Sequence, residues 1–361
     1  MKSSQMRSGA LKTDRRALLR GSAGFLALAT SPWAAAITST AQAQSAPSPE
    51  RRLPSPDAVR LALSDAYRTA GAVTAGKNAN YIPYLANVPS QLFGIAAMSM
   101  DGSVQEVGDS QYDFAIESIS KVFTLALALE QSGADAILQK IGADPTGEAF
   151  NSVMALELHH DKPLNPFVNA GAMATVSLIQ ARDAAERWNK IIGIYNEFSG
   201  RELSVNSDVY KSESDTNQHN RAIAWLLDNV GGMYSNPTEA VDIYTRQCSV
   251  SVTASDLAAM GATIANGGMH PKTRKRVISA ANCAKILAEM TLNGLYDSTG
   301  DWFYRTGLPA KSGVGGGILA IAPGRLSVAA FSPPLDEHGN SVRAQIAIGE
   351  IGQKLGLSVL Q

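Results

Sequence analysis

The segment FAIESISKVFTLALAL, residues 114–129, places Ser118 and Lys121 three residues apart at the start of an apolar run. Side chains three apart on a helix lie on one face, so the hydroxyl and the amine can meet if a helix begins near Ser118. A serine hydroxyl becomes a good nucleophile when a nearby base takes its proton. Burial against the apolar residues that follow would lower the pKa of Lys121 and let its amine act as that base.

A second segment, PAKSGVGGG at residues 309–317, places Lys311 before Ser312 and Gly313 on a predicted strand edge. A second ammonium group there would lower the pKa of Lys121 further, and a glycine lets the backbone approach a ligand closely. Ser-x-x-Lys followed far downstream by Lys-Ser/Thr-Gly is the signature of the penicillin-recognising serine enzymes. The two motifs together therefore favour covalent serine chemistry.

The same residues also have a purely structural interpretation. Ser-x-x-Lys occurs by chance in many chains; Ser118 would then cap a helix, and Lys121 would extend its amine to the surface. The third superfamily motif, Ser/Tyr-x-Asn, is matched only formally, by Ser204-Val205-Asn206. The order of the first two motifs, one at a helix start and one on a strand, favours the catalytic interpretation.

The elements that must position these residues follow from hydrophobic periodicity and turn signals. Residues 57–72 predict an amphipathic helix, and 91–109 predict a hairpin around Asp101-Gly102. Residues 118–290 are mainly helical in pattern. A second hairpin around residues 323–325 and a closing helix follow. We therefore predict an α/β (α+β) fold, with one sheet built from about 91–117 and 302–361 and a helical lobe inserted at about 118–290.

The N-terminal residues predict export from the cytoplasm. Residues 1–43 combine a basic leader with a mildly apolar stretch that ends in Ala41-Gln42-Ala43. The string TDRRALLR resembles a twin-arginine signal, and an ordinary secretory leader is the alternative. We expect cleavage of residues 1–43, a linker at 44–56, a single domain at 57–361, and a periplasmic or secreted protein.

Charge and composition exclude several classes of partner. Residues 1–43 hold six of the 31 Lys and Arg and one of the 32 Asp and Glu, so the remainder has a formal net charge of −6. An acidic chain without a basic stripe argues against binding to nucleic acid or to an anionic membrane. The five histidines lack metal-ligand spacing, so we expect no metal and no cofactor. Cys248 and Cys283 are expected to be free, mostly buried thiols, although export would also permit a disulfide.

From about Tyr81 to the C-terminus, the chain resembles the serine-dependent glutaminases. The resemblance rests on seven strings in the right order: NYIPYLANV, AIESISKVFTLALAL, KPLNPFVNAGAMATVSLI, SESDTNQHNRAIAWLL, YTRQCSVSVTASDLAAMGATIANGG, GLYDSTGDWFYRTGLPAKSGVGGGI and FSPPLDEHGNSVR. It implies a β-lactamase/transpeptidase-like fold and hydrolysis of L-glutamine, the expected small-molecule partner, to L-glutamate and ammonia. We also expect a homo-oligomer, a dimer or a tetramer.

The resemblance also implies a role for individual residues. Ser118 is the nucleophile and Lys121 its base; Lys311 is a further predicted catalytic residue from the Lys-Ser-Gly motif itself. Positions that match the family's substrate contacts are Ser118 itself, Asn169, Glu213, Asn220, Tyr244, Tyr296 and Val314, with Tyr81 lining the pocket.

The chemistry of these residue types suits glutamine. A carboxylate at Glu213 would bind the α-ammonium, while Asn169, Asn220 and Tyr244 would bind the α-carboxylate. Backbone N–H groups of Ser118 and Val314 would hold the oxyanion, and Tyr296 would relay a proton to the departing ammonia. Each of these residues also has a structural interpretation when it is considered alone. Asn169 could form a turn, Glu213 could be a solvent-exposed charge on a helix, and Tyr244 could be a core residue.

Two other functions remain alternatives from the sequence. A β-lactam-interacting enzyme of the same fold would keep a long-lived penicillin adduct on Ser118. An exported amino-acid-binding protein with an inactive catalytic pair would bind glutamine without turning it over. The presence of both Lys121 and Lys311 disfavours an inactive site.

Overall fold

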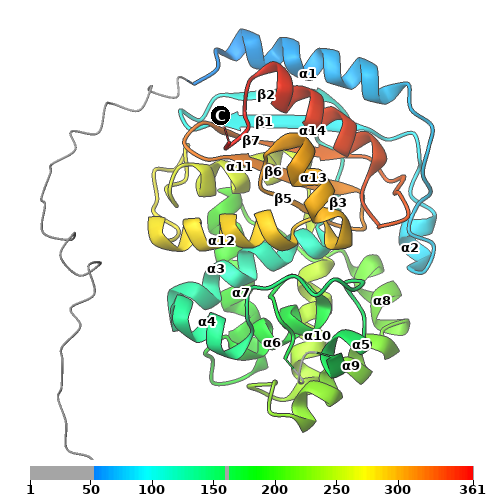
Figure 1. Cartoon of the computed structure of the whole chain (residues 1–361), viewed down its shortest axis with the longest axis vertical. Helices are drawn as coiled ribbons and strands as arrows, with labels where there is room; N and C mark the ends of the chain where they lie inside the picture. The colour runs from blue at the N-terminus through cyan, green and yellow to red at the C-terminus, as the bar shows by residue number, and fades with distance from the viewer. Residues whose placement is uncertain (1–52, 159–161, 361) are drawn as a thin grey trace, which may run out of the picture. The chain divides into compact units, whose positions relative to one another are not determined.

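A computed structural model describes residues 53–158 and 162–360, which contain a five-stranded antiparallel sheet (Figure 1). The strands lie in the order β2-β1-β7-β6-β5, and their bounds are β1 Gly94–Ser99, β2 Val104–Gly108, β5 Ala310–Ser312, β6 Gly317–Ala322 and β7 Leu326–Phe331. Because β1 pairs with β7, the N-terminal and C-terminal hairpins form one sheet. This confirms the prediction of a sheet assembled from distant segments.

Both faces of the sheet are buried. Alternate side chains of a strand point to opposite faces, and in β1 Ile95 and Ala97 enter one hydrophobic cluster while Ala96 and Met98 enter another. The first cluster includes apolar residues of α1 and α14, and the second includes those of α11 (Figure 1). The bounds of these helices are α1 Pro56–Gly71, α14 Val342–Lys354 and α11 Ala254–Ala265. Burial on both sides explains why β1, β6 and β7 read as continuous apolar runs.

Short-range signals place the predicted hairpins and the first helix. Gly102 has a φ of +86°, and the Asp101 carboxylate accepts a hydrogen bond from Ser103 N at 2.9 Å, which closes the turn between β1 and β2. Ser55 caps α1 by accepting from Ala58 N at 3.2 Å. These contacts span two or three residues, so they are visible in the sequence.

Helices between the two parts of the sheet form the predicted lobe, and Figure 1 shows most of them on the side of the sheet opposite α1 and α14. Their bounds are α3 Ser120–Ser132, α4 Ala134–Lys140, α5 Met154–Leu158, α6 Asn169–Leu178, α7 Ala184–Ser199, α8 Ser207–Asp215, α9 Gln218–Asn229, α10 Pro237–Cys248 and α12 Ala280–Asn293. The remaining short elements are α2 Pro83–Ala86, the 3-10 turns η1 Glu117–Ile119 and η2 Tyr296–Ser298, and α13 Thr299–Thr306.

Two details differ from the layout expected from the sequence. Phe114 and Ala115 form a strand, β3, that pairs with β4 (Ser251–Val252) instead of joining the main sheet. In addition, α11 lies within the range assigned to the lobe but packs on the sheet. Both differences depend on which surface buries an apolar segment, and periodicity does not identify that surface. The predicted export signal lies outside the described residues.

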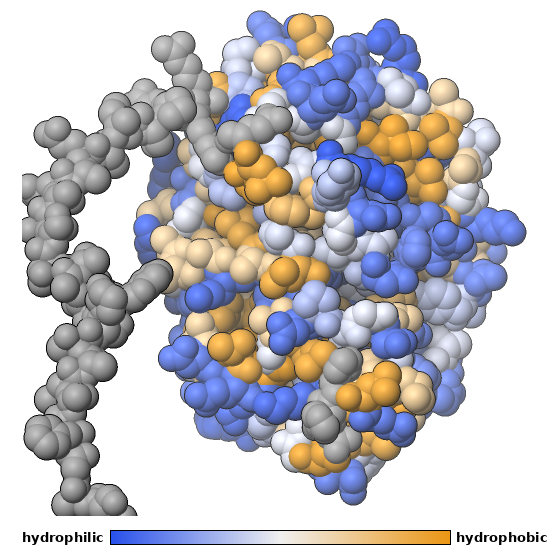
Figure 2. Space-filling view, viewed as in Figure 1, coloured by the Kyte–Doolittle hydropathy of each residue, from blue (hydrophilic) through white to orange (hydrophobic). Residues whose placement is uncertain are grey.

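The described surface and the cysteines agree with a globular protein. Figure 2 shows a face on which hydrophilic and hydrophobic side chains alternate in small groups. None of the helices in the described ranges combines the length and apolar character needed to cross a bilayer. Cys248 and Cys283 are both free and buried, as expected.

Candidate active site

Ser118 lies in the 3-10 turn η1, which directly precedes α3. It is 6% exposed, and the N-terminus of α3 has no side-chain cap hydrogen bond, so the helix-cap interpretation of Ser118 is wrong. The helix begins at Ser120, two residues later than Ser118 itself. Burial raises the pKa of Tyr296, the residue that opens η2, and the nearby Ser118 side chain opposes that rise. The predicted nucleophile therefore lies near a tyrosine supplied by a distant segment of the chain.

Lys121 is buried, with 1% of its surface exposed, so the alternative of a surface lysine is wrong. Its Nζ donates to Phe167 O at 3.0 Å and to Asn169 Oδ1 at 2.8 Å. Burial lowers the pKa of Lys121 to about 8, against the opposing effect of Cys248 and nearby carboxylates. No hydrogen bond joins Lys121 to Ser118 among the residues that the structure describes. A neutral amine has two N–H groups and one lone pair, so these two acceptors leave the lone pair free to take a proton.

Lys311, on β5, is also fully buried, and its Nζ donates to Gly294 O at 3.0 Å and to Ser312 O at 2.7 Å. The amine lies 4.4 Å from the centroid of the Tyr296 ring. Burial, and then the charge of Lys121, hold the pKa of Lys311 well below its usual value. We expected Lys311 to lower the pKa of Lys121. In the structure burial lowers the pKa of Lys121, and Lys121 adds to the lowering at Lys311.

Two glycines bring the turn after β5 against the chain that leads to Ser118. A Cβ on Gly313 would lie 2.9 Å from Ile116 O, and one on Gly315 would lie 2.5 Å from Ala115 O. Side chains at these positions would push the two backbones apart. Val314 lies between the two glycines and is buried, so its backbone comes close to the η1 turn. This placement suits the predicted oxyanion-binding role of its amide.

Three predicted substrate-binding residues form one hydrogen-bond chain. Tyr244 on α10 donates through its hydroxyl to Asn169 Oδ1 at 3.0 Å, and Asn169 Nδ2 donates to Asn220 Oδ1 at 3.0 Å. Asn220 Nδ2 in turn donates to Asn217 Oδ1 at 2.7 Å. Because Asn169 Oδ1 also accepts from Lys121, the same amide connects the base to the predicted carboxylate-binding residues. Tyr244 is buried, as a core residue would be, but its hydroxyl is part of this chain.

Glu213 lies on α8 beside a residue that the sequence analysis missed. Its carboxylate, that of Glu117 and the Cys248 thiol lie within 4.8 Å of one another, the only such group of potential metal ligands in the described ranges. Lys121 is close enough to act electrostatically on all three, and burial raises the pKa of the Cys248 thiol, which disfavours a thiolate ligand. Two carboxylates in this setting suit an ammonium group better than a metal ion. Glu117 directly precedes Ser118, and that adjacency was the available signal.

The formal Ser-x-Asn match belongs to another part of the lobe. Asn206 caps α8, where its Oδ1 accepts from Asp208 N at 3.0 Å and from Val209 N at 3.1 Å. Its capping role positions the helix that carries Glu213. The match is therefore explained by local structure.

A cleft of about 640 Å³ lies at the mouth of the site and is lined in part by Tyr81, Phe150 and Val314. Tyr81 is 55% exposed there, while desolvation and then the proximity of Tyr296 and two carboxylates raise the pKa of its phenol. The rings of Phe150 and Tyr296 are 4.6 Å apart. Two predicted substrate-binding residues, Tyr81 and Val314, therefore line this cleft, and Tyr296 contacts a third lining residue, Phe150.

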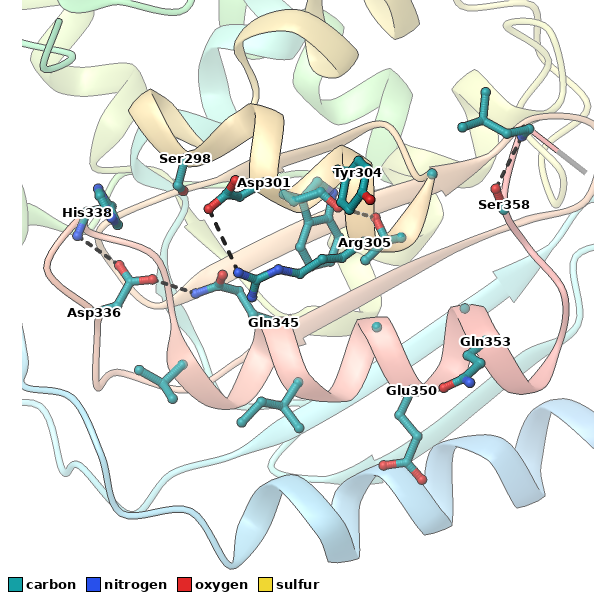
Figure 3. Close-up of a pocket in the computed structure, with 18 of the residues that line it drawn as sticks. Ser298, Asp301, Tyr304, Arg305, Asp336, His338, Gln345, Glu350, Gln353 and Ser358 are labelled. Atoms are coloured by element: carbon teal, nitrogen blue, oxygen red, sulfur yellow. Dashed lines mark hydrogen bonds and ion pairs between the residues drawn. The ribbon is translucent and has the colours of Figure 1, made fainter. Parts of the chain in front are cut away.

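A second cleft of about 1020 Å³ runs between α13 and α14 (Figure 3). Its polar side chains are largely paired with one another: Asp336 accepts from Gln345 Nε2 at 2.8 Å and from His338 N at 3.0 Å, and Arg305 lies 3.8 Å from Asp301 (Figure 3). The described residues that line it include none of the predicted catalytic or substrate-binding residues. The predicted site residues therefore lie outside this second cleft.

Comparison with known proteins places this geometry among glutaminases. The family model described as Glutaminase matches residues 76–360. The chain is 56% identical over 301 residues to a glutaminase of Mycobacterium ulcerans, covering 83% of this chain and 94% of that one. It is 57% identical over 302 residues to a glutaminase of Brucella canis, covering 84% and 95%. The solved structure of the probable glutaminase ybaS is 53% identical, with a TM-score of 0.84 over 85% of this chain and 100% of that one.

Proposed function

The chain belongs to the glutaminase family, so it hydrolyses L-glutamine to L-glutamate and ammonia, and we propose that it does so through an acyl-enzyme on Ser118. Its mixed α/β architecture is the β-lactamase-like fold of these enzymes. The observation that carries the proposed route is the hydrogen bonding of Lys121. Two acceptors occupy the N–H groups of a neutral amine whose lone pair is left for the serine proton.

In the proposed first half-reaction, Lys121 takes the proton of Ser118 Oγ while that oxygen attacks the side-chain amide carbon of glutamine. The resulting oxyanion accepts hydrogen bonds from the backbone N–H groups of Ser118 and Val314. The C–N bond then breaks, and the nitrogen leaves as ammonia after receiving the proton held by Lys121. Tyr296 supports this transfer, because it is close enough to Ser118 for the serine side chain to affect its pKa and its ring lies beside the amine of Lys311.

In the second half-reaction, water attacks the acyl carbon. Lys121 accepts a proton from that water and returns it to Ser118 Oγ as the ester bond breaks, which releases glutamate and restores the enzyme. A buried lysine with its pKa lowered to about 8 can perform both transfers near neutral pH. Burst kinetics, in which ammonia appears before glutamate in the first turnover, would test the acyl-enzyme directly.

Substrate recognition is proposed to divide between two parts of the lobe. In the chain of Tyr244, Asn169 and Asn220, the second N–H groups of the two amides supply donors for the α-carboxylate, and the Tyr244 hydroxyl holds Asn169 in place. Glu213 supplies an anion for the α-ammonium, and Tyr81 lines the mouth. This division requires a substrate that carries both charged groups on one carbon, as glutamine does.

Glu213→Gln is expected to lower kcat/KM for glutamine by about ten- to a few hundred-fold, because a charge-assisted hydrogen bond contributes about 1.5–3 kcal/mol and each 1.36 kcal/mol is a factor of ten. For glutamine without its α-amino group, the variant's kcat/KM should fall far less, because that substrate does not make this contact. The measurement compares wild type and variant on both substrates, with the exposed Glu202→Gln as a matched control. Equal losses on both substrates would contradict the assignment.

The setting and assembly of the enzyme are also proposals. The basic leader and its Arg15-Arg16 pair support export by the twin-arginine route to the periplasm or beyond. We further propose a homo-oligomer, a dimer or a tetramer, which light scattering of the mature protein would measure.

Replacing Arg15 and Arg16 with lysine is expected to leave the full-length precursor in the cytoplasm, because a twin-arginine receptor reads the arginine pair and not its charge alone. Cell fractionation followed by detection of precursor and cleaved forms measures the outcome. Arg7→Lys, outside the pair, serves as the control. Undiminished export of the double variant would assign the leader to the general secretory route.

A further inference from the structure

Two carboxylates from distant parts of the chain lie next to the nucleophile. Glu117 comes from the η1 turn and is 3% exposed, while Glu213 comes from α8. Their oxygens lie within the 4.8 Å cluster that also contains the Cys248 thiol. In the described part of the chain, Oε1 of each carboxylate is buried and has no hydrogen-bond partner. Two buried acceptors without donors in these described residues can each accept a hydrogen bond from a bound ligand.

Two buried carboxylates at this separation cannot both carry a full negative charge, so they share a proton. Burial raises the pKa of Glu213 to about 7, and burial together with Glu213 raises the pKa of Glu117 well above its usual value. The pair therefore keeps a proton at a higher pH than a single exposed carboxylate would.

None of the other titratable groups that face this pair donates a hydrogen bond to its two unpartnered Oε1 atoms in the described residues. Lys121 is the lysine among them, and its hydrogen bonds in the described residues go to Phe167 O and Asn169 Oδ1, with none to either Oε1 atom. The remaining groups are neutral near pH 7 because their pKa values are raised: Cys248, Tyr81, Tyr244 and Tyr296. Both Oε1 atoms can therefore accept hydrogen bonds from a bound ligand.

We propose that Glu117 and Glu213 together form the subsite for the substrate's α-ammonium, and that glutamine binding expels the proton which the empty pair shares. This inference rests on the proposed binding of the α-ammonium at Glu213 and adds Glu117 as a second, specificity-determining contact. The exchange is balanced in charge, because one ammonium enters and one proton leaves to solvent. An ammonium has three N–H donors, enough to reach both open Oε1 atoms.

Proton and substrate then compete for one place. Lower pH fills the pair with protons, so glutamine binds more weakly; higher pH empties it, so binding strengthens. Between about pH 6 and 8, the Kd for glutamine is expected to fall by about tenfold per pH unit for each proton displaced. An amide that lacks the α-ammonium gains nothing from emptying the pair and binds without this dependence.

Calorimetric titration of the Ser118→Ala enzyme with glutamine tests the exchange without turnover. Repeating the titration in buffers with different ionisation enthalpies counts the protons released on binding. We expect about one proton per site near neutral pH. The Ser118→Ala/Glu117→Gln enzyme should release almost none, whereas Ser118→Ala/Glu202→Gln should match the parent. Binding of glutamine without its α-amino group should release no proton from any of these three enzymes.

The pH dependence of KM in the active enzyme gives a second measurement. Glu117→Gln keeps the shape of the side chain and an acceptor oxygen, so its KM profile should flatten relative to wild type while turnover persists. Unchanged proton release and an unchanged KM profile in Glu117→Gln would overturn the proposal and leave glutamine hydrolysis intact. Failure of the wild-type enzyme to bind or hydrolyse glutamine would instead overturn the proposed function.

Discussion

Ser118→Ala is expected to lower ammonia release from glutamine by about 10⁴-fold or more, because the acyl-enzyme cannot form without the serine oxygen. The change removes one oxygen atom, and no hydrogen bond of the Ser118 side chain holds an element of the fold in the described residues, so the protein should fold as wild type does. Ammonia release by the mature protein measures the effect, and thermal unfolding checks the fold.

Ser132→Ala, at the other end of α3, is the matched control and should retain full activity. Glutamine should still bind to Ser118→Ala, because the predicted recognition residues are untouched. Substantial remaining turnover would place the nucleophile elsewhere. Wild-type protein that binds glutamine without releasing ammonia would favour the binding-protein alternative, and a long-lived penicillin adduct on Ser118 would favour the β-lactam alternative.

Lys121→Met is expected to lower kcat by about 10²–10⁴-fold, the range that general base catalysis contributes. Methionine fills similar space but has no lone pair basic enough to take the serine proton. The double variant Ser118→Ala/Lys121→Met should be little less active than Ser118→Ala alone, because nucleophile and base act as one unit. Steady-state kinetics of the single and double variants measure this.

The substitution also leaves Phe167 O and Asn169 Oδ1 without their donor, so unfolding must be measured beside activity. Lys285→Met, at an exposed position of α12, is the control for loss of a lysine. Because the pKa of Lys121 is lowered to about 8 and the neutral amine is the active form, wild-type kcat should rise with pH through that value. An active Lys121→Met beside an inactive Lys311→Met would assign the base to Lys311.

Several features of this protein could be predicted because they depend on neighbours in the chain. The Asp101-Gly102 turn is closed by contacts within three residues, and the apolar strands show in their composition. The three-residue spacing of Ser118 and Lys121 pointed to paired chemistry. The longer strings between Tyr81 and the C-terminus indicated the family, which the comparisons confirm.

Other features could not be predicted, because they arise between residues that are far apart in the chain. Periodicity indicated that α11 was a helix but not that it packs on the sheet, and Phe114 and Ala115 pair with a strand more than a hundred residues later. The adjacency of Glu117 to Ser118 was visible, yet its importance depends on Glu213.

The sequence by itself determined the family, the order of the elements and the residue types available for catalysis, because turn chemistry, periodicity and motif spacing act over a few residues. Only the tertiary structure decided the electrostatics of the site. Lys121 finds its acceptors 46 and 48 residues away, and Glu117 finds a second carboxylate on α8. A pKa depends on the water removed and the charges brought near, and both are set by packing distant segments together.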